Sequence, residues 1–123
     1  MSLNHLNLTV PSVQDTRNFF EKYFGFRRLV DRENLAVLSD QRGFVLALNN
    51  FGKAADVPYP KAFHVGFMQS DRQQVDEFYR RLKADGYEPG APKEFHGAWT
   101  FYFSAPGGFM IEVFHQPGHQ LQE

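Results

Sequence analysis

Four side chains able to carry acid–base or metal chemistry fall on one side of the expected strands. His64 interrupts the apolar run AFHVGFM at residues 62–68. A buried ring nitrogen without a partner costs on the order of 1–3 kcal/mol. Because side chains alternate along a strand, His5, His64, Tyr102 and Glu112 all face away from the apolar side of their strands. A face of this composition is too polar for a core and predicts a partly aromatic cavity.

The residue types leave several ways to satisfy His64. A strand histidine is often bonded to a backbone carbonyl or to water, and Glu112 can pair with one of the histidines. The chain has no cysteine, which excludes disulfides, thiolate ligands and a thiol nucleophile together.

Length and charge limit the classes of protein to which the chain can belong. The 123 residues suit one domain, and 13 basic against 14 acidic side chains give a net charge of -1 without a basic face for nucleic acid. The segment MSLNHLNLTV lacks the features of a signal peptide, and no apolar stretch approaches the ~18 residues of a membrane span. We therefore expect a cytoplasmic protein that binds neither nucleic acid nor membrane.

Hydrophobic periodicity predicts an internal repeat. The first half reads as a strand at 5–10, a helix at 12–25 and strands at 26–32, 34–40 and 43–50. The second half reads as a strand at 63–69, a helix at 70–86 and strands at 87–90, 99–105 and 108–115. The loop at 49–61 connects them. The pattern indicates one domain over 1–123, with module 1 at about 1–52 and module 2 at about 60–116.

Both expected helices carry start and stop signals. Ser12 caps the first helix and Gly25 ends it, whereas Ser70 or Asp71 starts the second and Gly86 ends it. The apolar stripes of the two helices consist of Val13, Phe19, Phe20, Tyr23 and Phe24, and of Val75, Phe78, Tyr79 and Leu82. Each helix is expected to cover one face of a sheet.

The order of these segments resembles the vicinal oxygen chelate superfamily, which includes glyoxalase I, bleomycin-resistance proteins, fosfomycin-resistance enzymes and extradiol dioxygenases. The resemblance rests on NHLNLTV, FFEKYFGF, FHVGF and FYFSAPGGFMIEVF, taken together in this order. It implies an α+β fold: two βαβββ modules form a cupped mixed sheet, with helices outside and a metal-centred cavity inside. The Ala-Pro-Gly-Gly turn at 105–108 replaces the family's usual Asp-Pro-Asp-Gly.

The resemblance implies His5, His64 and Glu112 as metal ligands, because they match the family's positions in the first strand of each module and the last strand of the second. Ala47 stands where a fourth ligand would be. Two imidazoles and one carboxylate suit Fe(II), Mn(II), Ni(II) or Zn(II), and leave positions open to substrate. Such a site can hold two adjacent substrate oxygens. A metal would then compensate His64.

Tyr102 is the expected catalytic residue. It precedes Glu112 by ten residues, like a tyrosine shared by extradiol dioxygenases and fosfomycin-resistance enzymes. We expect its hydroxyl to donate a hydrogen bond to a substrate oxyanion or to act as an acid, with core filling by the ring as the alternative.

Five further residues are expected to contact substrate: Asn7, Thr9, Asn49, His96 and Trp99. Asn49 aligns near the acid–base histidine of extradiol enzymes, His96 lies in a loop at the cavity mouth, and Trp99 walls the pocket. Polar lining, loop exposure and hydrophobic packing are the simpler interpretations. His115 and His119 are assigned no role.

Two functions of different classes remain. The first is a small metal-dependent enzyme acting on a small substrate with vicinal oxygens, by extradiol-dioxygenase-like or related lyase or transferase chemistry. Ala47 disfavours glyoxalase I chemistry, and no arginine follows Glu112 for a phosphonate. The second is a metal-free ligand-binding protein of the bleomycin-resistance type. The resemblance and the exposed sheet edges both favour a homodimer.

Overall fold

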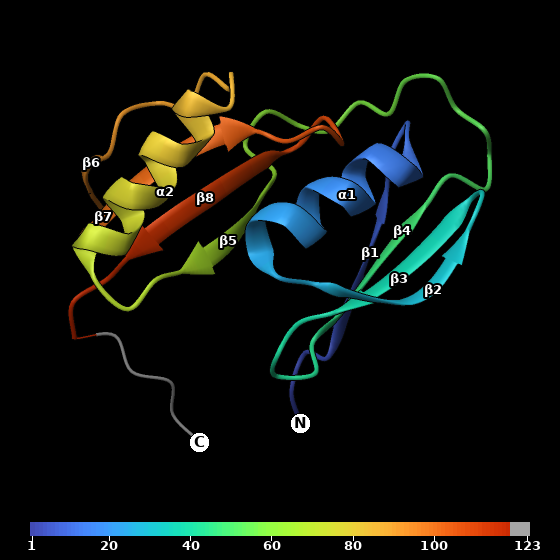
Figure 1. The fold of residues 1–123 in the computed structure, drawn as a ribbon, viewed down its shortest axis with the longest axis horizontal. Helices are drawn as coiled ribbons and strands as arrows, with labels where there is room; N and C mark the ends of the chain where they lie inside the picture. The colour runs from blue at the N-terminus through green and yellow to red at the C-terminus, as the bar shows by residue number, and fades with distance from the viewer. Residues whose placement is uncertain (119–123) are drawn as a thin grey trace. The chain divides into compact units, whose positions relative to one another are not determined.

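The structure is a computed structural model that describes residues 1–118, so His119 lies outside the described residues. The chain divides into two compact units. Of the described residues, the first unit comprises 1–59 and 106–108, and the second comprises 60–105 and 109–118. Each unit has its own helix and its own sheet (Figure 1).

The first unit is a four-stranded mixed sheet with one helix. Its elements are β1 (His5–Thr9), α1 (Val13–Phe24), β2 (Arg27–Arg32), β3 (Leu35–Ser39) and β4 (Val45–Asn49). The strand order is β1-β4-β3-β2, with β1 parallel to β4 and the other pairs antiparallel. In Figure 1, α1 runs along one face of this sheet.

The second unit repeats this topology. Its elements are β5 (His64–Met68), α2 (Arg72–Ala84), β6 (Lys93–Phe95), β7 (Ala98–Ser104) and β8 (Met110–His115). The strand order is β5-β8-β7-β6, with β5 parallel to β8. The expected α+β architecture of two βαβββ modules is therefore confirmed.

The helices begin and end where their capping residues indicate. The Ser12 side chain accepts from the Asp15 amide, and Gly25 ends α1 with a φ of 68°, a left-handed conformation that costs glycine least. Asp71, rather than Ser70, caps α2 by accepting from the Gln74 amide. No helix among the described residues is long and apolar enough to cross a membrane.

Alternation places the apolar side chains of each sheet against its own helix. In the first unit Leu8, Leu38 and Leu48 are buried, and in the second Phe101, Ile111 and Val113 are buried. Burial of each such side chain contributes roughly 1.5–3 kcal/mol. The polar residues between them consequently occupy the opposite face of each sheet.

The strand expected at 87–90 lies instead at Lys93–Phe95, and that prediction was wrong. Residues 87–90 form no strand. The strand that pairs with β7 is instead β6, and a tight turn joins the two. His96 and Gly97 have φ values of 51° and 77°, as a two-residue hairpin turn requires. A three-residue edge strand leaves almost no hydrophobic pattern to detect.

Candidate functional site

Glu112 lies at the centre of a row of three residues across the second sheet. It pairs with Gly66 of β5 on one side and with Tyr102 of β7 on the other. Directly paired residues of neighbouring strands project to the same face. The structure therefore brings Glu112 and Tyr102 together on the face opposite α2. Gly66 lies beside Glu112 and has no side chain to fill that position.

His64 approaches this row with one ring nitrogen and contacts the backbone with the other. Its Nε2 lies 3.5 Å from Glu112 Oε1. Its Nδ1 lies 2.9 Å from the Ala62 carbonyl oxygen. A carbonyl oxygen only accepts, so Nδ1 carries the proton and donates. In the neutral ring, Nε2 then presents a lone pair to a carboxylate oxygen.

Two facing lone-pair atoms repel each other unless a proton, a water molecule or a metal ion lies between them. The Tyr102 ring packs edge-on against the imidazole, with centroids 5.7 Å apart and planes at 82°. Because a metal-ligating histidine typically donates its other N–H to a carbonyl, His64 has the surroundings expected of a ligand.

Thr100 orients the carboxylate and was not identified from the sequence. Its hydroxyl donates to Glu112 Oε2 at 2.8 Å and lies 3.3 Å from the Val113 carbonyl oxygen. Thr100 is fully buried. The available signal was its place two residues before Tyr102 in the same strand, which puts both side chains on one face.

Tyr102 is held in its protonated form. Burial raises the pKa of its phenol, and the hydrogen bond to Glu112 and the negative charge of that carboxylate raise the pKa further. At neutral pH the hydroxyl is therefore a donor, and in this structure it bonds to Glu112. Its catalytic role stays a prediction.

Gly66 keeps the space beside the carboxylate open. A Cβ at this position would lie 3.2 Å from Phe114 Cε1 and 3.8 Å from Glu112 Oε1. Any other residue here would place carbon next to the oxygen that faces His64.

The first unit carries no carboxylate at the equivalent position. In the first unit His5 pairs with Val45, and Asn7 pairs with Ala47. In the second unit His64 pairs with Met110 in the same way, and Gly66 pairs with Glu112. The registers confirm that Ala47 occupies the place of Glu112. His5 is exposed, and its Nδ1 lies 3.1 Å from Asn4 Oδ1.

Three of the expected substrate-binding residues form one cluster. Asn49 Nδ2 donates to Asn7 Oδ1 at 2.6 Å and to Thr9 Oγ1 at 3.3 Å. We call Asn7, Thr9 and Asn49 the asparagine cluster. It lies on the face opposite α1, within the last three residues of β1 and at the last residue of β4.

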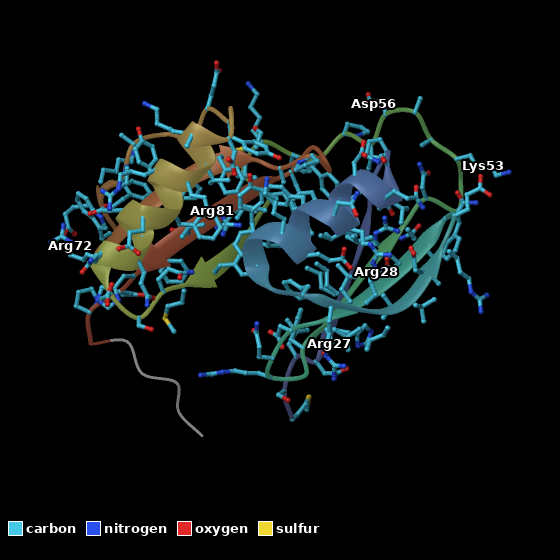
Figure 2. The ribbon with its side chains drawn as sticks, in the orientation of Figure 1. Arg27, Arg28, Lys53, Asp56, Arg72 and Arg81 are labelled. Carbon is cyan, nitrogen blue, oxygen red and sulfur yellow. The ribbon has the colours of Figure 1, made fainter. Side chains whose placement is uncertain are left out.

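The other two expected contacts lie elsewhere in the second unit. Trp99 projects toward α2, opposite to Tyr102: its Nε1 donates to Asp76 at 2.7 Å, and the Arg72 guanidinium lies 4.1 Å from the ring centroid. Figure 2 labels Arg72 at the start of α2. His96 is exposed in the β6–β7 turn, with its ring 3.9 Å from that of Phe95.

The expected ligand triad is divided between the two units. His5 belongs to the first unit, and His64 and Glu112 belong to the second. Within residues 1–118, no group of three or more His, Cys, Asp or Glu side chains stands together as a metal site. A hollow of about 260 Å³ on α2, lined by Gln74, Glu77, Phe78 and Arg81, lies on the helix side of the second unit, away from Glu112.

Comparisons with known proteins agree with this architecture. The model of the Glyoxalase/Bleomycin resistance protein/Dioxygenase superfamily matches residues 2–113. A Bacillus cereus structure described as a possible glyoxalase is 50% identical, with a TM-score of 0.83, over 92% of this chain and 97% of that chain.

More distant structures share the fold. A glyoxalase/bleomycin resistance protein/dioxygenase from Nocardioides is 22% identical, with a TM-score of 0.77, over 100% of this chain and 89% of that chain. Lactoylglutathione lyase from Agrobacterium tumefaciens is 18% identical, with a TM-score of 0.75, over 93% of this chain and 92% of that chain. With a family match over nearly its whole length and two βαβββ modules, the chain belongs to the glyoxalase/bleomycin resistance protein/dioxygenase superfamily.

Proposed function

We propose that the chain is a metal-dependent enzyme of this superfamily, in which His64 and Glu112, with His5 as the third ligand, hold one divalent ion. Its substrate is a small molecule with two vicinal oxygens. The reaction is of the extradiol-dioxygenase type or a related lyase or transferase type. The observation that carries the proposal is the 3.5 Å distance between His64 Nε2 and Glu112 Oε1. The ring proton of His64 is on Nδ1, where it is donated to the Ala62 carbonyl oxygen.

The donor set fits Fe(II), Mn(II), Ni(II) or Zn(II). Imidazole nitrogens and a carboxylate oxygen suit these ions, and three protein ligands leave open positions. When bound, such an ion polarises the substrate oxygens and stabilises negative charge on them. The 50% identical protein described as a possible glyoxalase supports an enzyme of this kind.

The residues around the ligands have separate tasks. Thr100 fixes the Glu112 carboxylate through Oε2, and the Ala62 carbonyl fixes the His64 ring through Nδ1. The Tyr102 hydroxyl, kept protonated by its raised pKa, donates a hydrogen bond to a substrate oxyanion or gives its proton to it.

We also propose a homodimer. β1 and β5 are edge strands of their sheets, and such edges tend to pair with or be covered by another chain. The third ligand, His5, is then supplied by the first unit of the same chain or of its partner. Sedimentation of the purified protein measures the assembly.

One observation favours the metal-free, ligand-binding alternative. Both oxygens of Glu112 already have partners, because Oε2 accepts from Thr100 and Oε1 faces His64. A protonated His64 would complete this pair without a metal.

Elemental analysis of protein purified without added metal or chelator separates the two. The proposal predicts about one divalent ion per chain. The ion is lost in His64→Ala and in Glu112→Ala while circular dichroism remains unchanged. Absence of metal, together with no uptake of Fe(II), Mn(II), Ni(II) or Zn(II), would leave the ligand-binding function.

A further inference from the structure

The asparagine cluster of the first unit has a fixed hydrogen-bond polarity. The Phe51 backbone N–H, which can only donate, lies 3.4 Å from Asn49 Oδ1. This contact assigns the oxygen of the Asn49 amide. The NH₂ group of Asn49 consequently faces Asn7 Oδ1 at 2.6 Å.

The polarity passes on to Asn7. Because Asn7 Oδ1 accepts from Asn49, its Nδ2 group carries two N–H donors directed away from that bond. Within residues 1–118, no protein group accepts from Asn7 Nδ2, and the side chain is exposed. The cluster therefore offers these N–H groups to an external molecule.

Thr9 adds a third donor. Its Oγ1 accepts from Asn49 Nδ2 at 3.3 Å, so its own proton points elsewhere. The Thr9 carbonyl oxygen accepts from the Tyr59 hydroxyl at 2.7 Å, which anchors this end of β1. The outward side of the cluster is thus made of donors, and it suits an acceptor such as a carboxylate rather than an ammonium group.

The charge on the same sheet face also favours an anionic ligand. Arg32 pairs with Leu35, and Leu35 pairs with Asn49, so the three lie in one row. The Arg32 guanidinium has no partner among residues 1–118. Arg32 therefore adds a positive charge to this face, and Glu33 follows it in the β2–β3 turn.

Asp31 is the one acidic residue within β1–β4, and it lies on the opposite face. There it binds Arg17 of α1 and Arg28, which also binds Glu21 of α1. Figure 2 labels Arg28 between α1 and β2. No carboxylate of these strands therefore competes for the cluster.

A row of apolar side chains lies beside these donors. Asn7 pairs with Ala47, Ala47 with Val37 and Val37 with Val30, and the three apolar side chains are half-buried. A ligand whose acceptor group meets Asn7 would lay an apolar body on this row.

We propose that the asparagine cluster binds the carboxylate of an organic acid with an apolar body. This inference goes beyond the proposed function of the metal site. Binding of a simple acid to the cluster needs no metal, so the two can fail separately.

The test is a titration of chelator-treated, ¹⁵N-labelled protein with benzoate and, separately, with benzylamine, which match in size and differ in charge. Benzoate is expected to shift the Asn7 side-chain amide signal, which is identified by its loss in Asn7→Asp, whereas benzylamine is not. Asn7→Asp replaces the two N–H donors with a negatively charged carboxylate. We expect it to weaken benzoate binding at least about 10-fold. Thr9→Val, which removes one hydroxyl, is expected to weaken it about 10-fold.

The matched control is Asn18→Asp, which makes the same charge change at an exposed position of α1, on the other side of the same sheet. It should leave benzoate affinity within about 2-fold of the parent, since a single distant surface charge is largely screened. No shift of the Asn7 amide by benzoate overturns the proposal. So does benzoate binding that survives Asn7→Asp and Thr9→Val. If benzoate binds as described but no metal is ever taken up, the subsite stands and the metal-dependent function falls.

Discussion

His64 Nε2 and Glu112 Oε1 face each other at 3.5 Å, while Nδ1 of the same ring is bonded to the Ala62 carbonyl. The pair is half-open to water, with 43% of the histidine side chain and 17% of the glutamate side chain exposed. A ligand can therefore reach both atoms without unfolding of the strands. The remaining contacts of the pair, through Thr100, Tyr102 and Gly66, can each be tested separately.

Thr100→Val should weaken metal binding through the orientation of Glu112. The substitution keeps the shape of the side chain but removes the hydroxyl that donates to Oε2 at 2.8 Å. We expect the metal affinity to fall about 10- to 100-fold, and the free energy of unfolding to fall by about 1–3 kcal/mol. Titration with Zn(II) and urea unfolding measure the two effects.

Thr16→Val is the matched control for Thr100→Val. Thr16 is also fully buried and donates to the Ser12 carbonyl at 2.8 Å, but in α1 of the other unit. It should lose stability without any change in metal affinity. Equal losses of affinity in both variants would show that Thr100 has no specific role.

Gly66→Ala should close the space beside Glu112. The new Cβ would lie 3.2 Å from Phe114 Cε1, so the ring must move by a few tenths of an ångström. We expect a folded protein with roughly 10-fold lower metal affinity. In Gly52→Ala, where the added Cβ meets no atom within 4 Å, the affinity should not change.

Tyr102→Phe should alter the dependence of stability on alkaline pH. The pKa of Tyr102 is raised in the folded protein above its ordinary value of 10.0, first by burial and then by Glu112. The folded state holds this proton more tightly than the unfolded state, so the resulting stability is present below pH 10 and is lost as pH rises through the folded pKa.

Urea unfolding between about pH 9 and pH 11 measures this difference. The free energy of unfolding should fall more steeply for the parent protein than for Tyr102→Phe. Tyr59 and Tyr87, whose pKa values are also raised by burial, are present in both proteins and do not affect the comparison. Parallel curves would rule out a tightly held Tyr102 proton.

Asp76→Ala should release the indole of Trp99, the only tryptophan of the sequence. The variant removes the acceptor that lies 2.7 Å from Nε1 and leaves a partly buried N–H without a partner. We expect a loss of about 1–3 kcal/mol in unfolding free energy and a red shift of the fluorescence. Unchanged emission would mean that Trp99 does not pack on α2 in solution.

Strong local signals made most of the fold predictable. Caps such as Ser12 and Gly25 fixed the helix ends, and strand alternation separated Leu8 from His5. The alignment of Ala47 with Glu112 held because both final strands keep the same register to their parallel neighbours.

The site was less predictable because it depends on contacts between strands. Thr100 reaches Glu112 across the ladder, and its spacing from Tyr102 gives the face on which it lies but not that bond. The aromatic character of Trp99 suggested a pocket wall, but its position three residues before Tyr102 places it on the opposite face. The β6 strand was misplaced because three residues carry no usable periodicity.

The most direct test of the metal site is the ¹⁵N resonance of the His64 ring during titration with Zn(II). Coordination by Nε2 should shift that nitrogen strongly while Nδ1 remains protonated on the Ala62 carbonyl, and Glu112→Gln should reduce the effect. An Nε2 signal that stays unchanged at saturating Zn(II) would contradict the proposal that His64 and Glu112 hold a metal.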